Sequence, residues 1–125
     1  MSLTRIVSKI FLPRQKELDR YTKNAVALQW QTLSNIVSEA QDTEYGRNHM
    51  FASINSYHDF ANNIPVNTYE ELKNDIDRMR HGESDVLWKG RVKWYAKSSG
   101  TTNDKSKFIP VSNEGLHHIH YKGGF

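Results

Sequence analysis

The chain has 125 residues, with 17 Lys or Arg against 14 Asp or Glu, so its formal net charge is +3. That length suits a single domain, and a hydrophobic share of 37% supplies a modest core. Cysteine is absent, which excludes disulfide scaffolds, cysteine-based zinc sites and thiol nucleophiles. No run of about 18 apolar residues occurs, so no transmembrane helix is expected.

The N-terminal segment, residues 1–16, carries basic side chains, no acidic one, and apolar residues on one helical face. We predict a short helix that stops near Pro13, because proline interrupts a helix interior. A transit peptide or a helix on a membrane surface is the alternative interpretation. The segment lacks the long apolar stretch and the cleavage site of a secretory signal. Since cysteine and Asn-x-Ser/Thr sequons are also absent, we expect a cytoplasmic protein.

A longer helix is predicted from about Leu18 to Ala40. Apolar residues recur there at alternating steps of four and three, a spacing that forms one stripe along a helix. The stripe consists of Val26, Trp30, Leu33, Val37 and Ala40. Such a stripe packs against a core, so Trp30 is interpreted as a core residue rather than a ligand contact.

The segment that follows alternates between loops and short helices. Residues 41–50 lose the helical period and contain a glycine, which predicts a loop. Ser56 can cap a short helix that ends near Asn62. Pro65 then favours an extended chain, because the residue before a proline is biased away from the helical region.

The helix with the clearest sequence signals begins after Thr68. Glu71 lies three residues on, and this spacing forms a capping box. Arg78 and Arg80 fall in the last turn, where positive charge interacts favourably with the helix dipole. We expect the buried face to consist of Leu72, Ile76 and Met79. The helix should end at residues 81–82, His-Gly.

Beyond residue 82 the pattern changes to that of strands. Residues 86–88 predict a short strand and residues 89–90 a turn. Residues 92–97 alternate apolar and basic side chains, which predicts a half-buried strand. Its inward residues would be Val92, Trp94 and Ala96. A loop of small residues, a second strand over the FIPV segment, and a helix from Ser112 to about Tyr121 complete the chain.

This order predicts a mixed α/β (α+β) fold, helical over residues 1–82 and with a small sheet and its loop over residues 83–125. Two short strands do not bury both faces of a sheet. We therefore expect the 125 residues to form a single incomplete domain, an N-terminal portion of a larger protein.

The loop at residues 98–107 is the densest candidate site. Ser98, Ser99, Gly100, Thr101 and Thr102 bring four hydroxyls and a glycine together, and two lysines follow closely. Phosphate oxygens need converging N–H and O–H donors with a cation, and glycine lets the backbone approach them. An ordinary polar hairpin loop is the alternative, because the same residue types dominate turns.

Other candidate sites are weaker. A Walker A loop is excluded, because no glycine precedes Lys105 and no helix is expected to follow. His117, His118 and His120 lack the further ligands of a zinc site. Basic residues interleaved with aromatic ones at 88–97 could bind nucleic acid, but a half-buried strand explains the same alternation, so no nucleic-acid partner is expected.

The segment WYAKSSGTTNDKSKFIPVS resembles the phosphate-binding motif of the acyl-acid–amido synthetases of the plant auxin-responsive family, within the adenylate-forming superfamily. The matching residues are Ser98, Ser99, Gly100, Thr101, Thr102, Lys107, Ile109 and Pro110. Asp104 stands where many members have glycine. The resemblance extends upstream through TEYGR (43–47), IPVNTYEEL and MRHGESDVLW, so it covers most of the chain from about Gln29 onward.

The resemblance implies an ATP-dependent ligase that activates a carboxylic acid as an acyl-AMP and passes the acyl group to an amine such as an amino acid. Ser98, Ser99, Thr101, Thr102 and Lys107 would hold the triphosphate, Gly100 would permit close approach, and Mg²⁺ would bridge the phosphates. Lys107 would carry the main catalytic charge, by stabilising the departing pyrophosphate. The family's other substrate-binding segments lie downstream of this loop, so the fragment alone would be inactive.

Two interpretations without catalysis stay open at this point. One is a small module whose basic loop binds a nucleotide or another anion. The other is a helical interaction domain that uses residues 18–40 as a partner-binding face, in which case the chain would self-associate. Neither involves a membrane.

Overall fold

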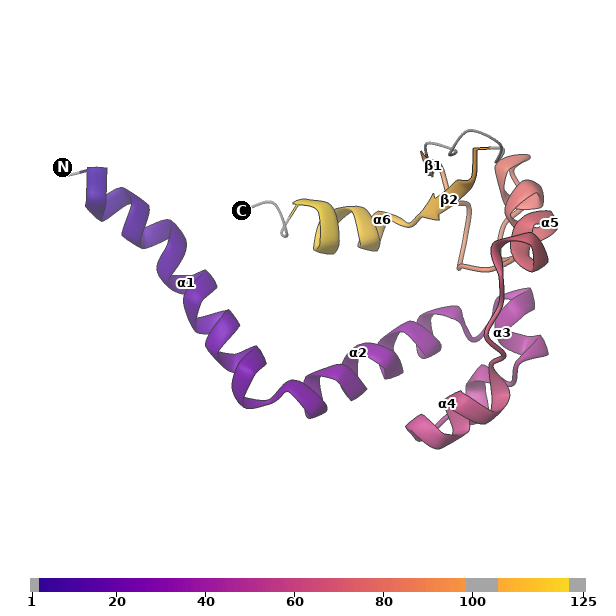
Figure 1. Cartoon of the computed structure of the whole chain (residues 1–125), viewed down its shortest axis with the longest axis horizontal. Helices are drawn as coiled ribbons and strands as arrows, with labels where there is room; N and C mark the ends of the chain where they lie inside the picture. Colours follow the sequence, from indigo (N-terminus) through magenta and orange to yellow (C-terminus); the bar gives the residue numbers. More distant parts are fainter. Residues whose placement is uncertain (1–2, 99–105, 122–125) are drawn as a thin grey trace. The chain divides into compact units, whose positions relative to one another are not determined.

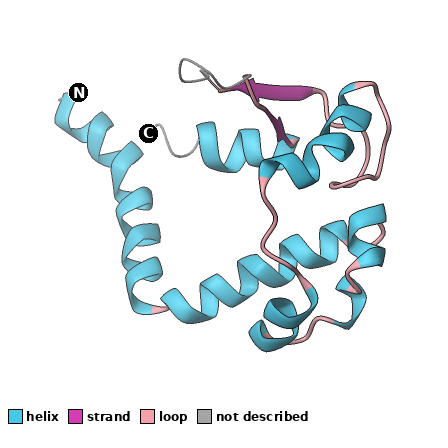
Figure 2. Cartoon of the chain, turned by 45° about the vertical axis from the view of Figure 1, so that its right-hand side comes forward, coloured by secondary structure: helices cyan, strands magenta, loops and turns pink. Residues whose placement is uncertain are grey.

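The computed structural model describes residues 3–98 and 106–121, and the chain divides into two compact units, Met1–Asn35 and Ile36–Phe125. The elements run from helices to a two-stranded sheet and back to a helix (Figures 1 and 2). This is the mixed, mostly helical fold that the sequence predicts. Within the described residues no helix combines the length and the apolar character that crossing a membrane requires.

The first unit contains α1 (Leu3–Lys23) and the beginning of α2 (Ala25–Ala40). The prediction of a stop near Pro13 is wrong, because α1 continues through it. Pro13 is exposed, so water can hydrate the carbonyl group that its missing amide leaves unbonded. The predicted helix over residues 18–40 is interrupted at Asn24, where α1 ends and α2 begins, although the Asn24 amide still donates to the Arg20 carbonyl at 3.1 Å.

The second unit begins within α2, where Val37 and Ala40 of the predicted stripe are buried. The prediction of a loop over residues 41–50 is wrong in part, since α3 (Glu44–Asn48) forms there. Thr43 makes this possible. Its side chain is 1% exposed, accepts a hydrogen bond from the Gly46 amide at 2.9 Å, and donates one to the Ala40 carbonyl at 2.7 Å. A buried cap of this kind starts a helix without a long apolar pattern.

Two short helices and an extended stretch connect α3 to the next long helix. The 3-10 helix η1 (Phe51–Ser53) follows Met50, which adopts a positive φ of 52°. As predicted, Ser56 caps a short helix, α4 (Tyr57–Asn63), by accepting a hydrogen bond from the Asp59 amide at 3.1 Å.

The predicted capping box is confirmed at the start of α5 (Tyr69–Arg80). The amide and the hydroxyl of Thr68 both donate to a Glu71 carboxylate oxygen, at 2.6 and 2.8 Å. Ile76 and Met79 are buried, as predicted, while Leu72 is half-buried. The helix ends at His81, and Gly82 follows with a φ of 99°.

The strand predicted over residues 86–88 does not form. The Glu44 amide donates to the Asp85 carbonyl at 2.7 Å, and the Tyr45 amide donates to the Val86 carbonyl at 3.0 Å. The first amides of a helix have no partner within the helix. Those of α3 take the carbonyl groups that a neighbouring strand would otherwise use.

The sheet is an antiparallel hairpin of β1 (Trp94–Lys97) and β2 (Phe108–Val111), with Trp94 opposite Val111 and Lys97 opposite Phe108. The predicted inner face is wrong for Trp94, which is 59% exposed, and for Ala96, which is also exposed, whereas Tyr95 packs against the core. Val92 is buried as predicted, but it precedes β1 and lies outside the ladder. The alternation of buried and exposed side chains predicted over residues 92–97 therefore does not hold within β1.

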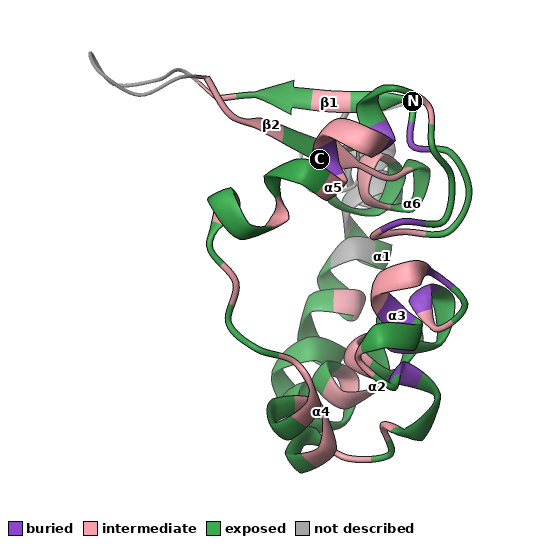
Figure 3. Cartoon of the chain, turned by 90° about the vertical axis from the view of Figure 1, so that its right-hand side faces the viewer, coloured by how far each residue is buried: buried purple, intermediate pink, exposed green. Residues whose placement is uncertain are grey.

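The core of the second unit centres on Met79, Val86 and Val92, with Tyr95 packed against them. It joins the end of α5, the segment after it, and the hairpin. Figure 3 colours the buried positions of the chain purple. Beyond β2, Ser112 caps the helical segment that the sequence predicts, by accepting a hydrogen bond from the Gly115 amide at 3.0 Å. That segment consists of α6 (Asn113–Gly115) and the π-helix η2 (Leu116–Tyr121).

Candidate functional site at the base of the hairpin loop

The first and last residues of the predicted phosphate site, Ser98 and Lys107, face each other across the hairpin. The Ser98 amide donates to the Lys107 carbonyl at 2.9 Å. The Lys107 amide in turn donates to the Ser98 hydroxyl oxygen at 3.2 Å. These two bonds extend the pairing of β1 and β2 by one residue pair and close the base of the loop.

The four predicted site residues between them, Ser99, Gly100, Thr101 and Thr102, lie outside the described residues. Their roles stay predictions. The structure does show that the two strands meet where those residues begin and end, because Ser98 and Lys107 are hydrogen-bonded to each other.

Helix α5 contacts the end of the loop through its first residue, Tyr69. The Phe108 amide donates to the Tyr69 hydroxyl at 3.0 Å. The Lys107 ammonium lies 5.3 Å from the centroid of the Tyr69 ring, within the range of a cation–π interaction. Tyr69 therefore contacts both the backbone after Lys107 and the charge of Lys107.

The last residue of α5, Arg80, contacts the same strand. Its guanidinium carbon lies 3.7 Å from the centroid of the Phe108 ring, and its Nη1 donates to Asp77 Oδ1 at 2.9 Å. Tyr69 and Arg80 are about three turns apart, so they project from one face of the helix. The start of β2 is thus contacted from both ends of α5.

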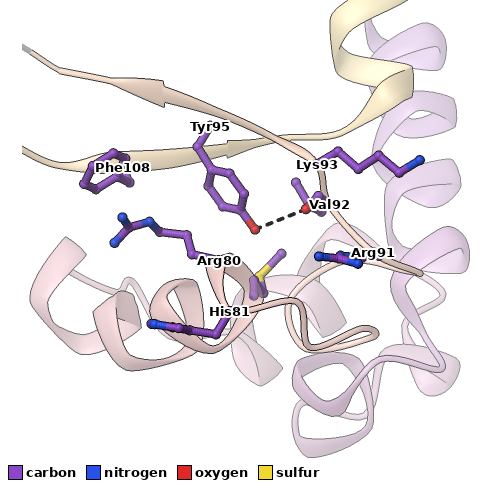
Figure 4. Close-up of a pocket in the computed structure, with 8 residues that line it drawn as sticks. Arg80, His81, Arg91, Val92, Lys93, Tyr95 and Phe108 are labelled. Carbon is purple, nitrogen blue, oxygen red and sulfur yellow. Dashed lines mark hydrogen bonds between the residues drawn. The ribbon is translucent and has the colours of Figure 1, made fainter.

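A cavity of about 610 Å³ opens between the end of α5 and the inner side of the hairpin (Figure 4). Its lining consists of Met79, Arg80, His81, Arg91, Val92, Lys93, Tyr95 and Phe108. Among the described residues that line it, none is acidic and three are arginine or lysine. The cavity therefore favours anions over cations.

Tyr95 points into this space from β1, and its hydroxyl donates to the Val92 carbonyl at 3.3 Å (Figure 4). Burial raises the pKa of Tyr95 above its ordinary value of 10.0, and the charges of Arg80 and Arg91 oppose that rise. Both guanidinium groups therefore act electrostatically on the Tyr95 hydroxyl, which stays protonated at neutral pH.

The predictions about metal ligands concern the histidines of the last helical segment. No cluster of three or more His, Asp or Glu side chains suitable for a metal ion occurs in the described part of the chain. At the loop, the described part of the chain contributes the Lys107 ammonium and the Ser98 hydroxyl, two groups of the kind that bind phosphate, while the Ser98, Lys107 and Phe108 amides are already hydrogen-bonded within the fold.

Comparison with known proteins identifies the family. Residues 14–124 match the GH3 family N-terminal domain. The chain belongs to the GH3 family.

Curated GH3 relatives come from Arabidopsis thaliana. The chain is 34% identical over 100 residues to the indole-3-acetic acid-amido synthetase GH3.15, an overlap of 79% of this chain and 17% of the relative. It is 29% identical over 106 residues to the 4-substituted benzoates-glutamate ligase GH3.12, an overlap of 84% of this chain and 18% of the relative. The chain thus spans less than a fifth of these relatives.

A solved structure of the GH3.15 acyl acid amido synthetase shares the fold, with a TM-score of 0.77 at 30% identity. The similarity covers 86% of this chain and 20% of that one. The resemblance read from the loop motif, and the mixed fold predicted from the order of the elements, are both confirmed.

Three residues at the site of this GH3 chain escaped the sequence analysis: Tyr69, Arg80 and Phe108. In the sequence, the position of Arg80 indicates only a favourable interaction with the helix dipole, and that of Tyr69 only the start of a capped helix. One sequence feature could have pointed to Tyr69 and Arg80. They are about three helical turns apart, so they lie on the face of α5 that also carries Ile76.

Proposed function

We propose that this chain is the N-terminal part of an ATP-dependent acyl-acid–amido synthetase. When ATP is bound, it supplies the α-phosphorus that a carboxylate oxygen of the acid attacks, with pyrophosphate as the leaving group. The amine nitrogen then attacks the acyl carbon of the acyl-AMP, AMP leaves, and the amine loses a proton. The partners would be ATP, a carboxylic acid and an amine such as an amino acid, in the cytoplasm, without nucleic acid or membrane.

The observation that carries this proposal is the pairing of Ser98 with Lys107 at the base of the SSGTTNDKSK loop. The pairing fixes the Lys107 backbone where the loop ends, so the ammonium can serve as a preorganised positive charge. We assign Lys107 to the negative charge that develops on the departing pyrophosphate. Acyl acid amido synthetases among the relatives support the proposed class of reaction.

The remaining loop residues would complete the triphosphate site. Ser98, Ser99, Thr101 and Thr102 would donate from hydroxyl and backbone groups, and Gly100 would allow close approach of the backbone. Mg²⁺ bound together with ATP would supply further positive charge at the phosphates, as it commonly does where a protein provides few direct ligands. We further propose that the 125 residues alone bind phosphate groups without completing the reaction.

The test is acid-dependent ATP–pyrophosphate exchange by the intact protein across a panel of carboxylic acids. Lys107→Ala should lower the exchange rate at least about 100-fold, the scale seen when a preorganised charge-stabilising group is removed. Lys73→Ala is the matched control, because Lys73 pairs with Glu70 on the exposed side of α5 and should leave exchange unchanged.

Two results would contradict the proposal. Exchange at the unaltered rate in Lys107→Ala would show that this lysine does not stabilise the departing pyrophosphate. Saturable ATP binding by the intact protein without exchange for any acid would instead favour an anion-binding module. That second candidate has support from the cavity beside β1, whose charged lining residues are Arg80, Arg91 and Lys93.

A further inference from the structure

The hydrogen-bonding directions of β2 leave one amide available to α5. Lys107 turns its amide and its carbonyl toward Ser98 on β1. In a strand, successive residues direct their backbone groups to opposite edges, so Phe108 directs its amide away from β1. The Tyr69 hydroxyl accepts that amide at 3.0 Å. The bond fixes the outer edge of β2 at the residue directly after Lys107.

The same tyrosine contacts the Lys107 side chain. The ammonium lies 5.3 Å from the ring centroid, where the negative face of an aromatic ring attracts a cation. A lysine has several freely rotating bonds and loses considerable entropy when it is held in one place. A fixed aromatic face reduces the number of conformations that the Lys107 side chain samples before any phosphate binds.

Tyr69 is itself well anchored. It is the first residue of α5, directly after Thr68, whose amide and hydroxyl are both bonded to Glu71. At the other end of the helix, Arg80 covers the Phe108 ring at 3.7 Å. The helix thus holds the start of β2 through two side chains that do not belong to the loop.

We propose that Tyr69 is a positioning residue for Lys107, with its hydroxyl holding the backbone after the lysine and its ring orienting the ammonium toward the bound phosphates. The inference rests on the proposed function, in which Lys107 stabilises the triphosphate. It adds a residue from a helix that the loop motif does not include.

Two substitutions separate the two contributions. Tyr69→Phe keeps the ring and removes the acceptor, and we expect the KM for ATP in the exchange reaction to rise about three- to tenfold, the effect of one lost hydrogen bond. Tyr69→Leu removes ring and acceptor together, and the increase should be larger. The KM for the carboxylic acid should stay unchanged in both.

A double-mutant cycle tests whether Tyr69 acts through the lysine. In a Lys107→Ala background, Tyr69→Leu should produce a much smaller further change, because the charge that it orients is already absent. Tyr57→Phe is the matched control. Tyr57 is 72% exposed on α4, and its substitution should leave all kinetic constants unaltered.

An unchanged KM for ATP in both Tyr69 variants would overturn the inference, and so would equal increases in the two KM values. Full additivity of the two substitutions would also overturn it. If Tyr69→Leu does not fold, as judged by its circular dichroism spectrum, the KM for ATP of the conservative Tyr69→Phe variant still tests the inference. An unaltered protein without acid-dependent exchange would refute the proposed function instead, so the two failures are distinguishable.

Discussion

Arg78 joins three segments of the second unit through its guanidinium group. It donates to Glu44 of α3 at 2.6 Å, to Asp75 of its own helix at 3.2 Å, and through Nε to Glu83 at 2.9 Å. Hydrogen bonds from Arg78 lower the pKa of Glu44 and of Glu83 below their ordinary value of 4.5. Both carboxylates are thus preferentially ionised in the folded chain.

This network predicts a pH dependence of stability. A carboxylate whose pKa is lowered by folding stabilises the fold above its unfolded pKa, and the contribution is lost as pH falls through the folded value. The free energy of unfolding should therefore decrease as pH falls below 4.5, the ordinary value for Glu44 and Glu83. Arg78→Gln should make that decrease shallower, as measured by urea unfolding at a series of pH values.

The control for this prediction is Arg20→Gln, which alters an exposed cation of α1. Its pH profile should follow that of the unaltered chain. An Arg78→Gln profile with the original slope would show that the lowered pKa values have another origin.

At the residue scale, sequence alone predicts what lies within one motif. Ser98 and Lys107 belong to one short segment, and the structure brings them together. Tyr69 and Phe108 are 39 residues apart. The sequence around Tyr69 predicts a helix start and the sequence around Phe108 predicts a strand, and neither pattern depends on the other residue. Nothing in a single sequence indicates that the hydroxyl of one meets the amide of the other.

At the scale of elements, helix boundaries follow from capping residues. Ser56, Thr68 and Ser112 were identified from their spacing, and each precedes a helix in the structure. Thr43 was missed because the helix that it starts has only five residues and no apolar stripe. Strands were harder to predict, since residues 86–88 obtain their bonds from helix amides, which no strand pattern reveals.

The cap of α5 gives a prediction at this scale. Thr68→Ala removes the side chain at the N-cap and should lower the free energy of unfolding by about 1 kcal/mol. Thr32→Ala in α2 is the matched control, because the Thr32 hydroxyl only bonds to the Leu28 carbonyl within the helix. That change should be neutral or slightly stabilising, since alanine favours helix interiors. Equal losses in the two variants, measured by urea unfolding, would contradict the assignment.

At the scale of the whole molecule, burial is unevenly distributed along the chain. Every residue that the structure describes as buried lies at Val37 or later, within the second unit. The first unit exposes apolar side chains, with Val26 exposed to 82%. Of the predicted apolar stripe, Val37 and Ala40 are buried as expected. Val26 is exposed and Trp30 is only half-buried, so the prediction that Trp30 is a core residue is wrong, and the stripe alone does not show where along it the core begins.

A matched pair of valines tests this distribution. Val86 is 2% exposed and belongs to the core cluster, so Val86→Ala should lower the free energy of unfolding by about 2 kcal/mol through lost burial and a residual cavity. Val26→Ala should change it by less than about 0.5 kcal/mol. Urea unfolding followed by circular dichroism measures both, and a comparable loss at Val26 would contradict the described burial.

A ribosome synthesises a chain from its N-terminus, so residues 43–48 are made before residues 85 and 86. At about 5–20 residues per second, the interval lasts about 2–8 s. Throughout it, the amides of Glu44 and Tyr45 lack their native partners, because the Asp85 and Val86 carbonyls that accept their hydrogen bonds in the fold do not yet exist. A five-residue helix is too short to persist unaided. Helix α3 therefore acquires its full set of bonds late in translation, as part of the same event that closes the core around Val86.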